Sequence, residues 1–309
     1  MGVGGVAAIR RVRVEAPTER RNAATERIDT LDTIGVLELI NAEDAGVAAA
    51  VAAALPQVAR AVDLAVACLR TGGRVHYAGA GSSGRYGVLD AAEIPPTYGF
   101  PADRFVAHIA GGAPALVRAV EEVEDDEDAG RAAVGTVAAG DLVIGITASG
   151  RTPYVAGALA GARARAAATV LLSSNPAAAL GAGVDVHIAV DTGPEAVTGS
   201  TRMKAGTAQK MVLHSFSTAV MVRLGRTYSN LMIDLAPNNG KLRARQVALL
   251  GMATGAGERV CGEALDDAGG EVRVALVALL TGVGTDVARA EVEAAGGDVR
   301  AAVARHPGA

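Results

Sequence analysis

The sequence predicts an α/β fold in which helices cover both faces of a parallel β-sheet. Strand-like and helical patterns alternate from residue 74 to about residue 190, and the strand-like runs are continuously apolar. Half of the residues are hydrophobic, with no Trp and only three Phe, and this composition favours helices and buried parallel strands over an aromatic-rich sandwich. Such sheets bind ligands at the carboxyl ends of their strands.

Composition and charge argue against several classes of protein. The net charge is −4 and no basic run stands out, so we expect no nucleic-acid partner. No apolar run reaches the roughly 18 residues that a membrane span needs, and Met1–Val14 lacks the layout of a signal peptide. Cys68 and Cys261 have no nearby cysteine, which predicts reduced, buried thiols. We therefore expect a cytoplasmic protein that does not contact a membrane.

The N-terminal region, residues 1–60, is predicted to consist of a leader followed by helices. Residues 1–17 mix Gly, Val and Arg without periodicity and are expected to form a loose leader. Thr33 is a candidate cap for a first helix. A single long Ala/Val helix is predicted from about Ala45 to Arg70, with a core-packing role.

The central region, residues 61–229, contains the alternating pattern. Its five strand-like runs are Arg74–Ala78, Phe105–Ile109, Asp141–Ile146, Ala168–Leu172 and Val186–Val190. The helical stretches between them are Ser83–Glu93, Pro114–Glu124, Tyr154–Ala166 and Ala177–Gly181. A long helix from about Thr201 to Leu224 is expected to complete this region.

The C-terminal region is predicted to be helical. Residues 230–257 are expected to form a linker and a helix, in which Asn239 and Lys241 are candidates for stabilising the site or an interface. Residues 258–309 contain three short helical patterns separated by glycine pairs or runs. We expect these patterns to form a small accessory bundle, similar to a UBA domain.

The glycine-rich segment Ala78–Gly87 follows the first strand-like run and predicts an anion-binding turn. Its glycines allow a ligand to approach the backbone, and the N–H groups that open the next helix point at that ligand. Ser82 and Ser83 add hydroxyl donors. The segment lacks the Gly-Lys-Ser/Thr ending of a P-loop, and no acidic residue follows a second strand as in a dinucleotide site. A tight turn without a ligand remains the alternative.

Three later loops repeat this pattern of glycine and hydroxyl groups at strand ends. They are Thr147–Pro153, Ser173–Pro176 and Asp191–Lys204. Any one of them is compatible with ordinary capping. Because all of them are expected at the same edge of one sheet, together they favour a polar small molecule that carries a phosphate.

These loops, on this alternating pattern, resemble the sugar isomerase (SIS) domain, a phosphosugar-binding fold. Five longer strings resemble the N-acetylmuramic acid 6-phosphate etherase family: Gly79–Arg85, Leu89–Gly99, Thr147–Tyr154, Val197–Lys210 and Asn230–Asp234. With the leader from Thr18, the similarity covers nearly the whole chain after residue 17. One departure is Ser82, where many members have Thr, and it keeps the hydroxyl group.

The resemblance implies a three-layer SIS-type sandwich with a five-stranded parallel sheet. It also implies removal of D-lactate from N-acetylmuramic acid 6-phosphate, in the recycling of cell-wall amino sugars. The family needs no metal or organic cofactor and forms homodimers. Three alternatives are weighed: an aldose–ketose isomerase on the same fold, a non-catalytic phosphosugar sensor similar to the glucokinase regulatory protein, and a nicotinamide-dependent oxidoreductase.

Cleavage of an ether at C3 without a metal needs a base for the C2 proton and an acid for the departing lactate. The histidines are poorly placed for this, since His108 lies in a strand and His214 in a helix. The resemblance places the two catalytic glutamates on Glu93 and Glu124. We assign Glu93 as the acid, at a helix end set by Pro95 and Pro96, and Glu124 as the base, and expect both to be buried.

Glu93 follows Ser82 by eleven positions, which is about 16 Å in an unbroken helix. This exceeds the reach of one hexose phosphate from its phosphorus atom to C3. Either the helix breaks early, or Glu93 serves a site that the partner subunit completes. We favour the second hypothesis.

The phosphate group is assigned to the loop hydroxyls and to two backbone N–H groups. The hydroxyls are those of Ser82, Ser83, Ser149 and Thr152, and the N–H groups are those of Gly84 and Gly150. Four basic residues are further candidates for substrate binding: Arg85, Arg151, Arg202 and Lys204.

Overall fold

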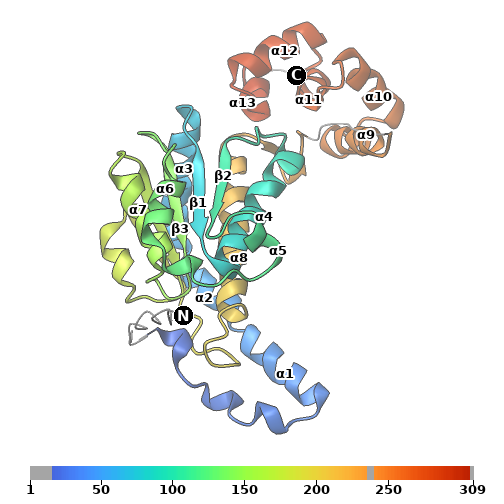
Figure 1. The fold of residues 1–309 in the computed structure, drawn as a ribbon. Coiled ribbons are helices and arrows are strands. Elements are labelled where there is room, and N and C mark those ends of the chain that lie inside the picture. The colour runs from blue at the N-terminus through green and yellow to red at the C-terminus, as the bar shows by residue number, and fades with distance from the viewer. Residues whose placement is uncertain (1–15, 235–239, 307–309) are drawn as a thin grey trace.

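The structure, a computed structural model, describes residues 16–234 and 240–306; Asn239 and the side chain of Lys241 lie outside the described part. Its centre is a five-stranded parallel sheet in the order β2-β1-β3-β4-β5 (Figure 1). The strands are β1 (Val75–Gly79), β2 (Phe105–Ile109), β3 (Leu142–Ile146), β4 (Ala168–Ser173) and β5 (Val186–Ala189). The predicted parallel sheet is confirmed.

Helices cover both faces of the sheet, because successive side chains of buried parallel strands point to opposite faces. Tyr77 and Ile144 belong to the core beneath α3 (Leu55–Arg70) and α8 (Lys204–Arg223). Val143 and Leu171 belong to the core beneath α7 (Pro153–Arg163). Helix α6 (Glu127–Ala133) packs on α7, and α4 (Gly81–Tyr98) packs on α8.

The N-terminal segment lies near the start of α8 and leads into three helices. Three short 3₁₀ turns come first: η1 (Pro17–Glu19), η2 (Ala23–Thr25) and η3 (Ile28–Thr30). Helix α1 (Thr33–Asp44) projects from the body and buries none of its residues (Figure 1). Even its apolar side chains Ile34 and Leu37 are more than half exposed. Helix α2 (Val47–Ala53) then leads into α3.

The C-terminal helices form a module with its own hydrophobic core. It contains α9 (Gly240–Thr254), α10 (Glu258–Asp267), α11 (Val272–Thr281), α12 (Thr285–Ala294) and α13 (Val299–Ala304). A hairpin of β6 (Thr227–Tyr228) and β7 (Leu231–Met232) joins it to α8, and Asp234 pairs with Arg226 and Arg273. The module lies at the end of the molecule opposite α1 (Figure 1).

Three predicted helices have different bounds. The helix predicted from Ala45 to Arg70 is interrupted at Ala54, because Pro56 in the first turn of α3 has no N–H to continue the α2 ladder. The last helix of the central region begins at Lys204 rather than Thr201. The segment after residue 258 forms four helices rather than three, and glycines of positive φ lie in the turns between them.

Two further differences concern the predicted catalytic residues. The Pro114–Glu124 helix is only α5 (Pro114–Val117) followed by a 3₁₀ turn, η4 (Val123–Asp125). The prediction that Pro95 and Pro96 end the helix at Glu93 is also wrong. Helix α4 continues to Tyr98 and ends at Gly99, whose φ of 56° is favourable for glycine.

No single helix in residues 16–234 and 240–306 is long and apolar enough to cross a membrane. Within the same residues, one pair of helical stretches passes such a test jointly: Thr33–Ala53, which comprises α1 and α2, and Leu55–Arg70, which is α3. The two stretches are bent by 57° at their junction.

Candidate functional site

The turn between β1 and α4 presents free backbone donors at the carboxyl edge of the sheet. Helix α4 starts at Gly81, so the N–H groups of Gly81, Ser82 and Ser83 have no acceptor within the helix. A Cβ atom at Gly84 would lie 2.6 Å from the Gly79 carbonyl oxygen. Glycine at position 84 therefore lets the start of the helix approach the strand closely.

The loop after β3 holds a second group of hydroxyls in a fixed arrangement. The Thr147 and Thr152 hydroxyl oxygens are 2.8 Å apart, and the Asn175 amide donates to the Ser149 carbonyl oxygen at 3.0 Å. Gly150 has a φ of 71°, and a Cβ atom there would lie 2.2 Å from the Cβ atom of Ala178. Contacts with the segment that follows β4 therefore fix the loop before any ligand binds.

The two loops face one cavity of about 450 Å³. The predicted phosphate residues Ser82, Ser83, Ser149 and Thr152 line it, together with Arg151. Residues that line it without having been singled out as site residues include Glu19 and Thr201. The signal that points to Glu19 is its place in the leader string that begins at Thr18, which is part of the family resemblance.

Glu124 lines the same cavity, on the turn η4. Arg85 holds the preceding segment, because its guanidinium donates to the carbonyl oxygens of Ala115, Leu116 and Arg118 at 3.0–3.2 Å. Arg85 thus does not line the cavity but supports the segment that leads to Glu124. Glu122 adopts the left-handed conformation with a φ of 66°, an uncommon one for a side chain of this kind.

Glu93 lies elsewhere, on the exposed side of α4. It lines a separate cavity of about 130 Å³ between α4 and α8, with Asp90, His214 and Ser217 among its neighbours. Burial raises the pKa of Asp90, while hydrogen bonds from Tyr77 and Ser217 act in the opposite direction. Helix α4 is unbroken between Ser82 and Glu93, so one chain does not place Glu93 beside the phosphate loops.

Several predicted features of the site differ in the structure. Glu93 and Glu124 are both exposed in the single chain, rather than buried. The Gly84 N–H donates to the Ala80 carbonyl at 3.1 Å, and the Gly150 N–H donates to the Thr147 hydroxyl at 3.3 Å. Because these N–H groups have partners inside the chain, the free donors are those one turn earlier, at the start of α4.

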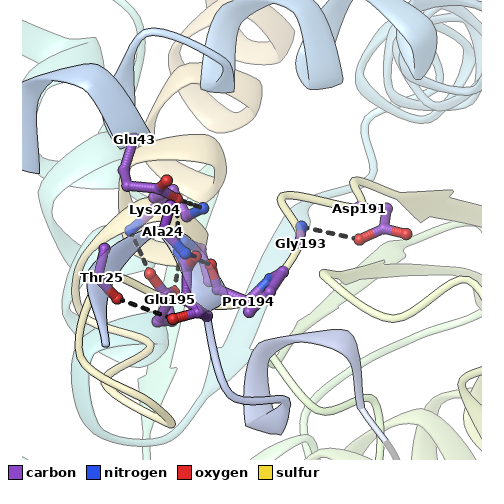
Figure 2. A network of polar contacts seen from close by, with 10 residues as sticks. Ala24, Thr25, Glu43, Asp191, Gly193, Pro194, Glu195 and Lys204 are labelled. Atoms are coloured by element: carbon purple, nitrogen blue, oxygen red, sulfur yellow. Dashed lines mark hydrogen bonds and ion pairs between the residues drawn. The ribbon is translucent and has the colours of Figure 1, made fainter. Parts of the chain in front are cut away.

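Lys204 and Arg202 do not line the cavity. Arg202 is exposed, whereas Lys204 is buried, and its Nζ lies 2.5 Å from the Glu43 carboxylate (Figure 2). Asn22 also donates to Glu43, at 2.8 Å. Burial raises the pKa of Glu43, but the hydrogen bonds from Lys204 and Asn22 outweigh it and lower the pKa overall.

Glu195 completes this network beneath the start of α8. Its fully buried carboxylate accepts the N–H groups of Lys204 and Ala205 at 2.9 and 3.0 Å, which satisfies two of the unpaired donors of that helix (Figure 2). The network joins the N-terminal segment to α8 next to Thr201. It therefore fixes one wall of the cavity.

Among residues 16–234 and 240–306, no group of three His, Cys, Asp or Glu side chains is arranged to hold a metal ion. The hydrogen-bond donors of the cavity are hydroxyls, backbone N–H groups and one guanidinium, which suit phosphate oxygens, and its lining also includes the carboxylates of Glu19, Glu124 and Asp125.

Comparisons with known proteins agree with this geometry. The model of the glucokinase regulatory protein N-terminal SIS domain matches residues 57–163, and the SIS domain model matches residues 117–219. The fold is similar to a putative phosphosugar isomerase involved in capsule formation from Bacteroides fragilis, with a TM-score of 0.51 and 18% identity over 67% of this chain and 98% of that chain.

Closer relatives cover most of the sequence. The chain is 60% identical over 261 residues to the N-acetylmuramic acid 6-phosphate etherase of Thermobifida fusca, covering 84% of this chain and 86% of the relative. It is 51% identical over 257 residues to the protein of the same name from Symbiobacterium thermophilum, covering 83% and 86%.

Proposed function

We propose a mechanism for a lyase reaction, because the chain belongs to the N-acetylmuramic acid 6-phosphate etherase family. The protein is a carbon–oxygen lyase of amino-sugar recycling. It converts N-acetylmuramic acid 6-phosphate and water to N-acetylglucosamine 6-phosphate and D-lactate. The observation that supports this most directly is the single cavity that combines phosphate-binding loops with Glu124.

The sugar reacts in its open form. The C1 aldehyde makes the C2 proton acidic, and the C3 ether oxygen is then β to the carbonyl group. A base removes the C2 proton, the electron pair forms the C2–C3 double bond, and the C3–O bond breaks as an acid protonates the lactate oxygen. Water then adds at C3 and a proton returns to C2, so the two groups exchange acid and base roles.

The phosphate binds between the two loops. The N–H groups of Gly81, Ser82 and Ser83 at the start of α4 supply backbone donors. The hydroxyls come from Ser82 and Ser83 in the same turn and from Ser149 and Thr152 in the opposite loop. Arg151 lines the same cavity and adds positive charge. This assignment keeps the predicted hydroxyls and moves the backbone donors to the first turn of α4.

Glu124 is the base at C2, and Glu93 is the acid for the lactate oxygen. Support for Glu124 is its place in the phosphate cavity. Glu93 follows Ser82 on the unbroken helix α4 by a rise of about 16 Å, so it reaches a substrate held in the second subunit of a homodimer. The uncovered apolar helix α1 supports a dimer, since a helix that is apolar around most of its circumference is ordinarily covered.

Because its phosphorylated substrate is an anion that does not cross a bilayer unaided, the enzyme acts in the cytoplasm.

Incubation of the purified protein with N-acetylmuramic acid 6-phosphate in deuterated water tests the proposal. Free D-lactate together with deuterium at C2 of the product is expected. Lactate without deuterium at C2 would contradict the elimination, and absence of lactate would contradict the lyase itself.

A further inference from the structure

Besides Glu124, two carboxylates that the mechanism does not use line the substrate cavity: Asp125, which follows Glu124 in η4, and Glu19. Glu19 lines the cavity together with Ser82, Ser83, Ser149 and Glu124. It comes from the N-terminal segment, 63 positions before Ser82 of the first phosphate loop. A catalytic base and a phosphate site need no further negative charge, so this carboxylate requires its own explanation.

Contacts with the body of the protein hold the segment that carries Glu19 beside the cavity, and the Glu19 side chain itself is exposed. It is the last residue of η1, whose Pro17 and Thr18 are buried, and the Gly199 N–H donates to the Thr18 carbonyl at 3.2 Å. A Cβ atom at Gly199 would lie 3.0 Å from Oε2 of Glu19. The bare turn at Gly199, with a φ of 74°, therefore makes room for the carboxylate.

The Glu19 carboxylate has no hydrogen bond or ion pair with any residue in the described part of the chain, 16–234 and 240–306. Two parts of the substrate would be repelled by it, since the phosphate and the lactyl carboxylate are both anions. What it can accept is a hydrogen bond from a neutral O–H group. In the opened sugar, the hydroxyls at C4 and C5 lie between the phosphate on C6 and the reacting carbons C2 and C3.

We propose that Glu19 is a specificity residue that accepts hydrogen bonds from the C4 and C5 hydroxyls of the opened sugar. This inference rests on the proposed function for the identity of the sugar. Glu19 fixes the middle of the chain while the loops hold its phosphate end, and so places the C2 proton opposite Glu124. It also disfavours phosphate esters that carry an anionic group at these carbons.

Binding measurements test the role without relying on turnover. The variants are Glu19→Ala and Glu19→Gln, with Glu26→Gln as a matched control, because Glu26 is an exposed carboxylate of the same segment, lies 3.6 Å from Arg21 and does not line the cavity. Calorimetric titrations use N-acetylglucosamine 6-phosphate, its 4-deoxy analogue and inorganic phosphate. Circular dichroism and thermal melts establish that each variant is folded.

The Kd of N-acetylglucosamine 6-phosphate is expected to rise by about 10- to 100-fold in Glu19→Ala, as for a lost hydrogen bond to a charged group. Glu19→Gln keeps an acceptor oxygen and should fall between that variant and the wild type. The Kd of inorganic phosphate should stay the same or decrease, because a repulsive charge is removed. The 4-deoxy analogue should bind the wild type more weakly than the parent compound does. Its affinity should also decrease less between the wild type and Glu19→Ala.

Three results would overturn the inference. They are an unchanged Kd for the sugar phosphate, an equal weakening for sugar phosphate and inorganic phosphate, and the same effect in Glu26→Gln. None of these depends on lactate release. Failure of the lyase assay and failure of this assignment are therefore distinguishable.

Discussion

Both ends of the central sheet contain polar side chains, but those at the amino end are mostly paired with one another and those at the carboxyl end are open to a cavity. At the amino end, Asp141 accepts the N–H groups of Arg74 and Ala138 at 2.7 and 2.8 Å. Its carboxylate also lies 3.4 Å from the fully buried ring of His76, and His76 and His108 are joined at 3.0 Å. Most of these polar groups pair with one another, although Nε2 of His76 has no hydrogen-bond partner among the described residues, and none of them lines the cavity between the hydroxyl loops.

At the carboxyl end, the polar groups face a cavity. The first N–H groups of α4 have no acceptor within the helix, and the Glu19 carboxylate has no partner in the described part of the chain. A buried polar cluster that is internally paired stabilises a fold, whereas preorganised donors and acceptors left open are free to bind a ligand. Substitutions at the two ends should therefore have separable effects, on stability at one end and on the reaction at the other.

The largest effect is expected for Glu124→Gln at the carboxyl end. Loss of the C2 base should lower kcat by about 10²- to 10⁴-fold and abolish deuterium incorporation at C2 as well as lactate release, with an unchanged melting temperature. The control is Glu121→Gln, an exposed glutamate of the same acidic run that does not line the cavity. An equal loss in both variants would show that the charge of the run, and not Glu124 itself, is required.

A second prediction concerns assembly of the carboxyl-end site from two subunits. Glu93→Gln and Glu124→Gln are each expected to be inactive as homodimers. Random reassociation of the two variants gives heterodimers with one intact site, so about a quarter of the wild-type lactate release should return. If each subunit used its own two glutamates, no activity would return on mixing, although gel filtration and differential tags would show that heterodimers had formed.

The sequence predicts the fold well because the relevant signals are local. Continuous apolar runs identify the strands, and all five appear in the sheet at nearly the expected positions. The predicted phosphate hydroxyls also gather on one cavity, since parallel strands bring their carboxyl ends to one edge.

Other features depend on contacts that no local pattern contains. The helix predicted up to Glu124 ends at Val117, where Arg85, thirty residues earlier, takes up the carbonyl oxygens of Ala115 and Leu116. Lys204 resembles a substrate-binding cation in sequence, yet it pairs with Glu43, which lies 161 positions away. Glu19 reaches the cavity only because the N-terminal segment folds back onto Gly199.

A third prediction compares the two phosphate loops with a hydroxyl outside the site. Ser82→Ala and Thr152→Ala should each raise KM by about 10- to 100-fold, since a hydrogen bond to a charged phosphate is lost. The melting temperature should change little for Ser82, which caps no other group in the described residues. Ser215→Ala, on the exposed side of α8, is the control and should leave KM unchanged. Unchanged KM in both loop variants would place the phosphate elsewhere.

A fourth prediction addresses the amino end. Asp141→Asn removes the charge that pairs with Arg74 and replaces an acceptor by a donor next to the two N–H groups. We expect the free energy of unfolding to fall by about 1–3 kcal/mol, measured by urea denaturation, with kcat and KM unchanged. A variant of normal stability and reduced turnover would reverse the assignment of the two ends.

The smallest effect is a pH dependence of stability that also arises at the amino end. Burial lowers the pKa of His108 to about 4, with further lowering by His76 and Arg74, and burial also lowers the pKa of His76. The unfolded chain, in which a histidine has a pKa of about 6.5, therefore binds more protons than the folded chain between these values. The contribution of the neutral histidines to the free energy of unfolding is therefore fully present above about pH 6.5, and it decreases as the pH falls toward 4.

Thermal melts at pH 7 and pH 5 measure this decrease, and His108→Gln isolates one source of it. Gln keeps a hydrogen-bonding group beside His76 but does not titrate, so the melting temperature of this variant should fall less between the two pH values than that of the wild type. His76 and His187, whose pKa values burial also lowers, should leave a residual dependence. Equal decreases in both proteins would mean that protonation of His108 costs no stability. The polar groups at the amino end would then not form the tightly packed cluster that distinguishes this end of the sheet from the carboxyl end.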